Sequence, residues 1–186
     1  IRYFLTRQVP LGEDGDFSEE AMVGRINGEL ADDLGNLVYR VLSLTSSWEG
    51  GIEGRPELDR QLNLEKIDEY MRDFRIDKAL EEIWSFVRNV NKYINEKEVW
   101  RLKGDEFRSA LFNLLESLRI IGILLQPFMP DTSGRIFVQL GLDKQNMKEC
   151  RFNERFGGKP KKGAYLFKKI EERIKGGVHG DLGTAA

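Results

Sequence analysis

Apolar residues spaced three and four apart are the dominant pattern, beginning after a polar turn at residues 12–16. Ser18, followed by two glutamates, predicts a helix N-terminus, because its hydroxyl can accept from free backbone N–H groups and acids favour a first turn. Gly28 predicts a break or a bend, after which a leucine stripe indicates a longer helix from about residue 29 to residue 44.

The same spacing returns after an irregular stretch at residues 46–63, whose glycine-rich run cannot hold a regular element. Helical spacing resumes at about residue 67, and Asp77 is expected to cap a helix that runs to about residue 95. Gly104 begins the strongest stripe, which alternates steps of four and three residues as far as Leu125.

Proline ends this stripe. Pro127 and Pro130 remove backbone donors, and Asp131 is expected to cap a last short helix. No convincing strand pattern precedes residue 150, and Ala164–Phe167 is an apolar patch that fits either a strand or a docking segment. Amphipathic helices must bury their stripes against one another, so the pattern predicts an all-α fold, a helix bundle.

Composition supports a folded chain. Of its 186 residues, 40% are hydrophobic and 32% charged, a mixture that can bury a core. No window approaches the roughly 18 apolar residues of a membrane span. The start lacks an initiator Met and the order of a signal peptide, so we expect a piece of a longer, cytoplasmic protein. The single cysteine, Cys150, excludes an internal disulfide framework and a cysteine-rich zinc site.

Charge is balanced overall but uneven along the chain. A net charge of −2 and a pI of about 5.7 argue mildly against a dedicated nucleic-acid binder, which usually carries a basic footprint. Residues 151–175, however, hold nine Lys or Arg against three Glu. The basic character is therefore a property of one segment.

Groups for catalysis are not assembled by this sequence. The only histidine, His179, lies in a glycine-rich tail, so the sequence predicts neither a Ser-His-Asp set nor a Cys-His pair. No glycine-rich phosphate-binding loop precedes a helix that carries a Lys. Acidic pairs such as Asp32-Asp33 are adjacent and splay apart on a helix, which is typical of a solvated face. We therefore expect no catalytic residue, no cofactor site and no metal site in this chain.

Several polar and aromatic residues fit a recognition surface. Asn36 and Arg40 share one face of their helix on the flank of its leucine stripe, where they form either an ordinary polar flank or a pair that reads an unpaired base. Trp100 belongs to no helical stripe, so it either plugs the end of the bundle or offers a platform for a base. Asn91 falls on an apolar stripe, needs a partner, and is expected to support the loop that carries Trp100.

Read in order, several motifs resemble the methionyl-tRNA synthetase family of class I. The resemblance covers residues 1–142 and weakens towards Ile170-Glu171. It is carried by Arg2-Tyr3-Phe4-Leu5, Asp14-Gly15-Asp16-Phe17-Ser18, Asn27 to Arg40 with Leu34-Gly35-Asn36-Leu37, Asn91 with Tyr93-Ile94, Glu98 with Trp100, and Leu125 with Pro127-Phe128-Met129-Pro130.

The resemblance implies a class I aminoacyl-tRNA synthetase anticodon-binding helix bundle. It implies that Trp100 stacks on an anticodon base and that Asn36 and Arg40 contact the first base of CAU, so the partners are the tRNA(Met) anticodon loop and a catalytic domain of the same enzyme. ATP, Mg²⁺ and, in some members, Zn²⁺ belong to that missing catalytic half. Many members have Pro before the Trp, where this chain has Val99, which predicts a less rigid loop.

With the resemblance, the chain divides into a linker at 1–17, the bundle at 18–142, a basic segment at 143–175 that packs back on the bundle or on the catalytic half, and a flexible tail at 176–186. Two alternatives remain open. One is the anticodon-binding domain of another class I synthetase, such as the leucine, isoleucine, valine or cysteine enzyme. The other is a helical protein-interaction module, which the acidic pI favours and which requires Trp100 to be buried.

Overall fold

The computed structural model describes residues 1–15 and 17–171. Within them the regular elements are helices, without a strand and with one isolated antiparallel bridge between Glu53 and Arg155. The prediction of an all-α bundle is confirmed, whereas the expected tail and His179 lie outside the described residues. The α-helices are α1 (Arg2–Gln8), α2 (Glu19–Arg25), α3 (Asn36–Leu44), α4 (Leu64–Arg72), α5 (Ile76–Glu96), α6 (Gly104–Leu125) and α7 (Pro130–Leu140). The π-helix is η1 (Ile26–Gly35), and the 3-10 turns are η2 (Thr45–Ser47), η3 (Asp59–Gln61), η4 (Val99–Arg101) and η5 (Met147–Glu149).

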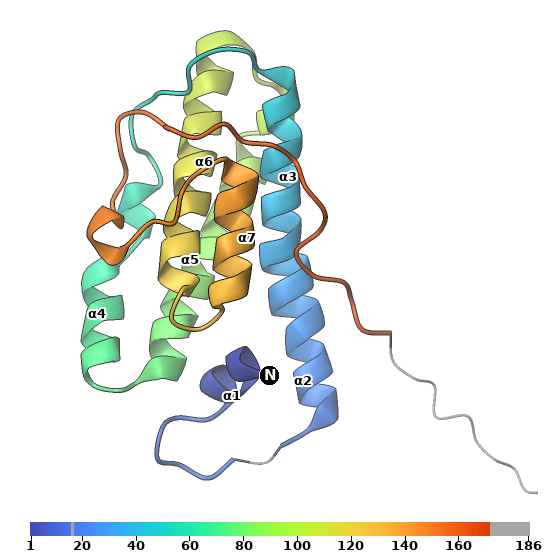
Figure 1. The fold of residues 1–186 in the computed structure, drawn as a ribbon, viewed down its shortest axis with the longest axis vertical. Helices are drawn as coiled ribbons and strands as arrows, with labels where there is room; N and C mark the ends of the chain where they lie inside the picture. The colour runs from blue at the N-terminus through green and yellow to red at the C-terminus, as the bar shows by residue number, and fades with distance from the viewer. Residues whose placement is uncertain (16, 172–186) are drawn as a thin grey trace, which may run out of the picture.

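Helix α6 lies at the centre of the bundle and contacts α3, α5 and α7 (Figure 1). Every residue from Ala110 to Leu125 is buried, which explains why its apolar stripe is the strongest in the sequence. Gly122 allows α7 to approach closely, since an added Cβ would lie 2.9 Å from the ring of Phe137. None of the helices in the described part of the chain has the length and apolarity needed to span a bilayer.

A buried amide helps to hold the irregular stretch between α3 and α4, where backbone bonds also join Ile52 to Phe156 and Gly54 to Glu154. Asn113 of α6 is fully buried, accepts from the backbone N–H of Glu57 at 2.7 Å and donates to the carbonyl of Arg55 at 3.0 Å. These bonds satisfy backbone groups that a helix or sheet would otherwise pair. The stretch is therefore a fixed loop across one end of the bundle.

A break at Gly28, one of the two outcomes expected there, is wrong. Helix α2 continues through Gly28 into η1 and then α3, and the change that occurs is one of helical register. A single glycine inside a helix costs only about 1 kcal/mol, and apolar packing on either side outweighs it. The predicted start of α2 is confirmed, since the side chain of Ser18 accepts from the N–H of Ala21 at 3.2 Å.

Two predicted helix caps are also wrong. Arg75 is the N-cap of α5, so Asp77 lies inside the first turn, where its charge faces the helix dipole. Met129 is the N-cap of α7, and Pro130 takes the first helical position, where its missing N–H costs nothing. Asp131 again falls one position inside the helix.

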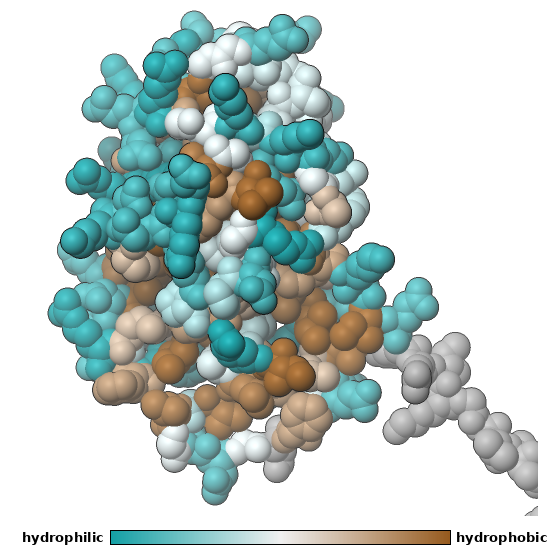
Figure 2. Space-filling model, viewed as in Figure 1, coloured by the Kyte–Doolittle hydropathy of each residue, from teal (hydrophilic) through white to brown (hydrophobic). Residues whose placement is uncertain are grey.

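Residues 1–17, expected as a linker, contain helix α1. Its Tyr3 and Phe4 are buried, and the ring of Tyr3 lies 4.6 Å from that of Trp84 on α5. Figure 2 shows hydrophobic residues gathered at this end of the molecule. Within residues 1–17, the large hydrophobic residues Ile1, Leu5, Leu11 and Phe17 are exposed. Two buried aromatic residues in so short a segment give too little periodicity to predict a helix.

Candidate nucleic-acid interface

Asn36 and Arg40 lie on the solvent-facing side of α3. Asn36 is exposed and Arg40 is half-buried. A guanidinium nitrogen of Arg40 donates to Oδ1 of Asn95, near the end of α5, at 2.6 Å. This bond orients the side chain, and the guanidinium carries more donors than it uses. The α3 face therefore combines an exposed amide with an oriented cation.

Trp100 lies in η4, between α5 and α6. The side chain is 53% exposed, whereas the preceding Val99 is fully buried. Glu98 has a φ of 44°, in the left-handed region, and it turns the chain so that Val99 enters the core while Trp100 stays outside. Val99, and not Trp100, fills this end of the bundle, so the tryptophan ring has an open face.

Hydrogen bonds link Arg40 to the turn that carries Trp100. Asn95, the acceptor for Arg40, receives the N–H of Glu98 on its own carbonyl at 3.2 Å. The carbonyl of Glu98 then accepts the N–H of Arg101 at 2.7 Å. Figure 1 shows the end of α3 and the α5–α6 connection at the same end of the bundle. The structure thus brings the Arg40 region and the Trp100 turn into one connected unit.

Asn91 has partners, but they are not in the loop that carries Trp100. Its amide donates to the carbonyl of Asp33 at 3.0 Å, inside η1 and one turn before Asn36. Trp84, two turns earlier on α5, donates to the carbonyl of Glu29 at 3.3 Å. A π-helix widens the backbone turn and disturbs the ordinary pairing of its carbonyls. Asn91 and Trp84 supply donors to that segment, so Asn91 fixes the helix ahead of Asn36.

A second flank of the α3 face was missed by sequence reasoning. The ring of Tyr165 stacks on Tyr39 with centroids 3.9 Å apart and planes 13° apart. The ammonium of Lys162 lies 3.7 Å from the centroid of Tyr39, and its hydrogen bond and charge hold the pKa of Tyr39 below the ordinary value. The apolar patch around Tyr165 and the basic segment were the available signals, but neither reveals the partner.

Residues 159–171, which we term the C-terminal strap, run along α7 and then along α3 and η1 (Figure 1). Arg135 of α7 donates to the carbonyls of Tyr165 and Leu166 at 2.8 Å, and Leu166 is buried. Farther along, Asn27 both donates to and accepts from the backbone of Ile170, at 3.0 and 2.8 Å. Of the two expectations for the apolar patch, a docking segment is the one observed.

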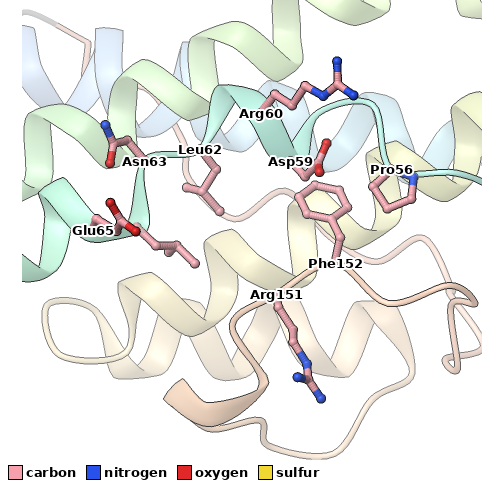
Figure 3. Close-up of a pocket in the computed structure, with 9 residues that line it drawn as sticks. Pro56, Asp59, Arg60, Leu62, Asn63, Glu65, Arg151 and Phe152 are labelled. Carbon is pink, nitrogen blue, oxygen red and sulfur yellow. The ribbon is translucent and has the colours of Figure 1, made fainter.

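The pocket drawn in Figure 3 lies on the other side of the bundle, near α4. It has a volume of about 580 Å³ and lies between the loop before α4 and the residues after η5. Phe152 and Asp59 lie beside each other there, and Arg60 and Arg151 point away from one another (Figure 3). Its charged side chains do not converge on a common point, so the α3 face remains the better candidate site.

Two family models match the chain. The model described as the anticodon-binding domain of tRNA ligase matches residues 61–174, and the model described as tRNA synthetases class I (M) matches residues 1–42. Asn36 and Arg40 fall within the second match, and Trp100 falls within the first.

Similar proteins agree with these models. The chain is 42% identical to the methionine–tRNA ligase of Caldanaerobacter subterraneus subsp. tengcongensis, over 92% of this chain and 30% of that protein. It is 36% identical to the Clostridium acetobutylicum methionine–tRNA ligase, over 94% and 31%. The apo methionyl-tRNA synthetase of Mycobacterium tuberculosis aligns with a TM-score of 0.78 and 30% identity, over 91% of this chain and 38% of that one.

The chain thus spans about 30% of the length of the curated relatives it matches. One of the two family models covers more than half of the chain and carries the anticodon-binding description. The helices on which the candidate residues lie have the arrangement of the solved relative. The chain belongs to the anticodon-binding domain family of tRNA ligases, and the relatives to which it is similar are methionine–tRNA ligases.

Proposed function

We propose that this chain recognises the CAU anticodon of tRNA(Met) as the anticodon-binding part of a methionine–tRNA ligase. The rest of that enzyme supplies the catalytic half, which uses ATP and Mg²⁺ to attach methionine. The observation that carries the proposal is the exposed ring of Trp100 in the turn that is hydrogen-bonded to Asn95, the partner of Arg40.

The chemistry of this surface suits a single-stranded loop. Unpaired bases can leave their stack, lie against an aromatic ring and present their edges to hydrogen-bonding side chains. Trp100 provides the ring, while Asn36 provides a donor and an acceptor and Arg40 provides further donors. Each of these groups is at the surface, so a loop can reach them without unfolding the bundle.

The two alternative functions, a protein-interaction module and the anticodon domain of another class I synthetase, each predict a different observation. The protein-interaction module requires a buried Trp100, and the observed 53% exposure counts against it. The anticodon domain of another class I synthetase keeps the bundle but has no reason to prefer CAU. The first base of the anticodon therefore distinguishes the methionine assignment from its nearest rival.

The test is binding of this chain to two anticodon stem-loops that differ only in CAU versus GAU, at two salt concentrations. We expect a preference for CAU of about fivefold or more, because a wrong base at a recognised position costs about 1–3 kcal/mol. Equal affinities with a steep salt dependence would reduce the interface to a nonspecific RNA contact. Absence of binding to either stem-loop would contradict the proposal.

A further inference from the structure

Three lysines of the C-terminal strap form a concentrated positive charge on a nearly neutral chain. Lys159, Lys161 and Lys162 are all exposed. Among the described residues, the strap takes part in one salt bridge, from Lys169 to Asp32 at 2.8 Å, and that bridge lies farther along the strap. None of the three lysines therefore has a carboxylate partner among the described residues, and the ammonium of Lys162 lies over the ring of Tyr39.

One of these lysines, Lys162, is adjacent to the proposed base-reading face. Residues on a helix are separated by about 100°, so Tyr39 and Arg40 lie on opposite sides of Asn36, roughly 60° and 40° away. Lys162 lies over Tyr39 at 3.7 Å, on the flank of Asn36 opposite to Arg40. The exposed Asn36 therefore has the Arg40–Asn95 pair on one side and Lys162 of the strap, next to Lys161 in the chain, on the other.

Fixed contacts hold the lysines in this place. The backbone N–H of Lys161 donates to the carbonyl of Gln139 at 2.7 Å, and the side chain of Gln139 pairs with the backbone of Gly163 and Ala164. Tyr165 then stacks on Tyr39. The backbone that carries Lys161 and Lys162 is thus anchored before and after the lysines, which reduces the entropy lost when a ligand binds them.

We propose that Lys161 and Lys162 contact the sugar-phosphate backbone of the anticodon stem-loop whose bases meet Asn36, Arg40 and Trp100. This inference rests on the proposed function. Lysine binds phosphate as a point charge, and backbone contacts position a nucleic acid without reading its sequence. The strap sets the register of the RNA on α3, and the α3 face and Trp100 read the bases.

The experiment compares wild-type chain with Lys161→Ala/Lys162→Ala, using the CAU and GAU stem-loops over a salt series from about 50 to about 200 mM. The double variant should lose affinity for both stem-loops by the same factor, so the ratio between them stays unchanged. The slope of log affinity against log salt should fall by about 0.7 for each single-stranded phosphate that is no longer neutralised, or by about 0.9 for each phosphate of a duplex.

The matched control is Lys144→Ala/Lys148→Ala, which removes the same charge from exposed positions. Lys148 lies in η5, beside α4 and on the opposite side of α6 from α3 (Figure 1). Tyr165→Ala is a second variant, which keeps every lysine but removes the stack on Tyr39. We expect the control to bind like wild type and Tyr165→Ala to weaken both stem-loops, since it displaces the lysines without neutralising them.

The outcomes separate this inference from the proposed function. A wild-type chain without preference for CAU refutes the proposed function. A wild-type chain that prefers CAU, with Lys161→Ala/Lys162→Ala unchanged in affinity and salt slope, refutes the strap contact alone. An equal loss in the Lys144→Ala/Lys148→Ala control would also refute it, because general charge attraction would then explain the effect. Circular dichroism of each variant checks that the bundle is intact.

Discussion

Arg119 and Arg40 occupy opposite surroundings on two helices that contact each other. Arg119, on α6, is 2% exposed, pairs with the fully buried Glu116 at 2.7 Å, and donates to the carbonyls of Glu149 and Arg151. Arg40, on α3, is half-buried and has one side-chain partner among the described residues, Asn95. The first arginine is enclosed by acceptors, and the second retains donors at the surface.

The difference separates structural charge from charge available to a ligand. A buried ion must be paired and hydrogen-bonded, because removing it from water costs several kcal/mol. Glu116 meets this condition through Arg119 and the backbone N–H of Asn153, at 2.9 Å. The pair holds the residues after η5, where the chain turns towards the C-terminal strap. Among the described residues the α3 face is not enclosed in this way, and Arg40 there keeps donors that the edge of a base can accept.

The largest effect should follow from Arg119→Met. The substitution leaves the Glu116 carboxylate buried without its cation and removes donors from two carbonyls. We expect the free energy of unfolding to fall by about 3–5 kcal/mol, measured by urea denaturation. Arg108→Met on the same helix is the control. Arg108 pairs with Asp105 at 2.9 Å but is one-third exposed, so it should cost at most about 1 kcal/mol. Equal losses in the two variants would contradict the distinction.

Trp100→Ala should weaken binding and spare the fold. Stacking on an aromatic side chain contributes about 1–3 kcal/mol per base, so the CAU stem-loop should bind less tightly by that amount. The unfolding midpoint should stay close to wild type, since Val99 fills the core beneath. Phe74→Ala removes another exposed ring, 67% accessible, at the α4–α5 turn and should leave binding unchanged. A loss of helicity in Trp100→Ala would return the residue to a structural role.

Arg40→Ala should act on discrimination more than on stability. If Arg40 meets the first anticodon base, the difference in affinity between CAU and UAU stem-loops should shrink by about 1–3 kcal/mol. The free energy of unfolding should change by less than about 0.5 kcal/mol, because the hydrogen bond to Asn95 that the variant lacks is exposed. Equal weakening of both stem-loops would identify Arg40 as a backbone contact.

The spacing of apolar residues and prolines in the sequence predicted the long helices and the boundary between α6 and α7. The stripes of α5 and α6 recur at helical spacing because each residue packs on a neighbouring helix, and Pro127 and Pro130 mark the boundary between α6 and α7. The register change in η1 could not be predicted, because its carbonyls depend on donors from Trp84 and Asn91, more than fifty residues away. The predicted N-caps at Asp77 and Asp131 are misplaced because an aspartate suits the first turn of a helix as well as it suits the N-cap position.

The candidate site also contains features that the sequence predicted and features that only the fold reveals. Asn36 and Arg40 were placed on one helix face by spacing, and resemblance to a family added the role of Trp100. The exposure of Trp100 depends on the left-handed backbone at Glu98. A glutamate gives no indication in the sequence that it adopts this conformation. The stack of Tyr165 on Tyr39 joins segments far apart in the chain, so neither tyrosine could be assigned before the fold was known.

Asn91 is intermediate between a buried structural polar group such as Arg119 and an exposed one such as Asn36. Its substitution should give the smallest effect on stability and binding. Its amide is half-buried and donates to Asp33 at 3.0 Å and more weakly to Val87 at 3.4 Å. Asn91→Ala leaves the carbonyl of Asp33 without this donor, so we expect a loss of about 1 kcal/mol in unfolding free energy. Affinity for the CAU stem-loop should fall slightly too, because the helix just before Asn36 loses its tie to α5. Asn95→Ala, one turn later on α5 and exposed, is the control and should change stability by less than about 0.5 kcal/mol. If Asn95→Ala proves as destabilising as Asn91→Ala, burial does not divide structural from binding polar groups on this helix.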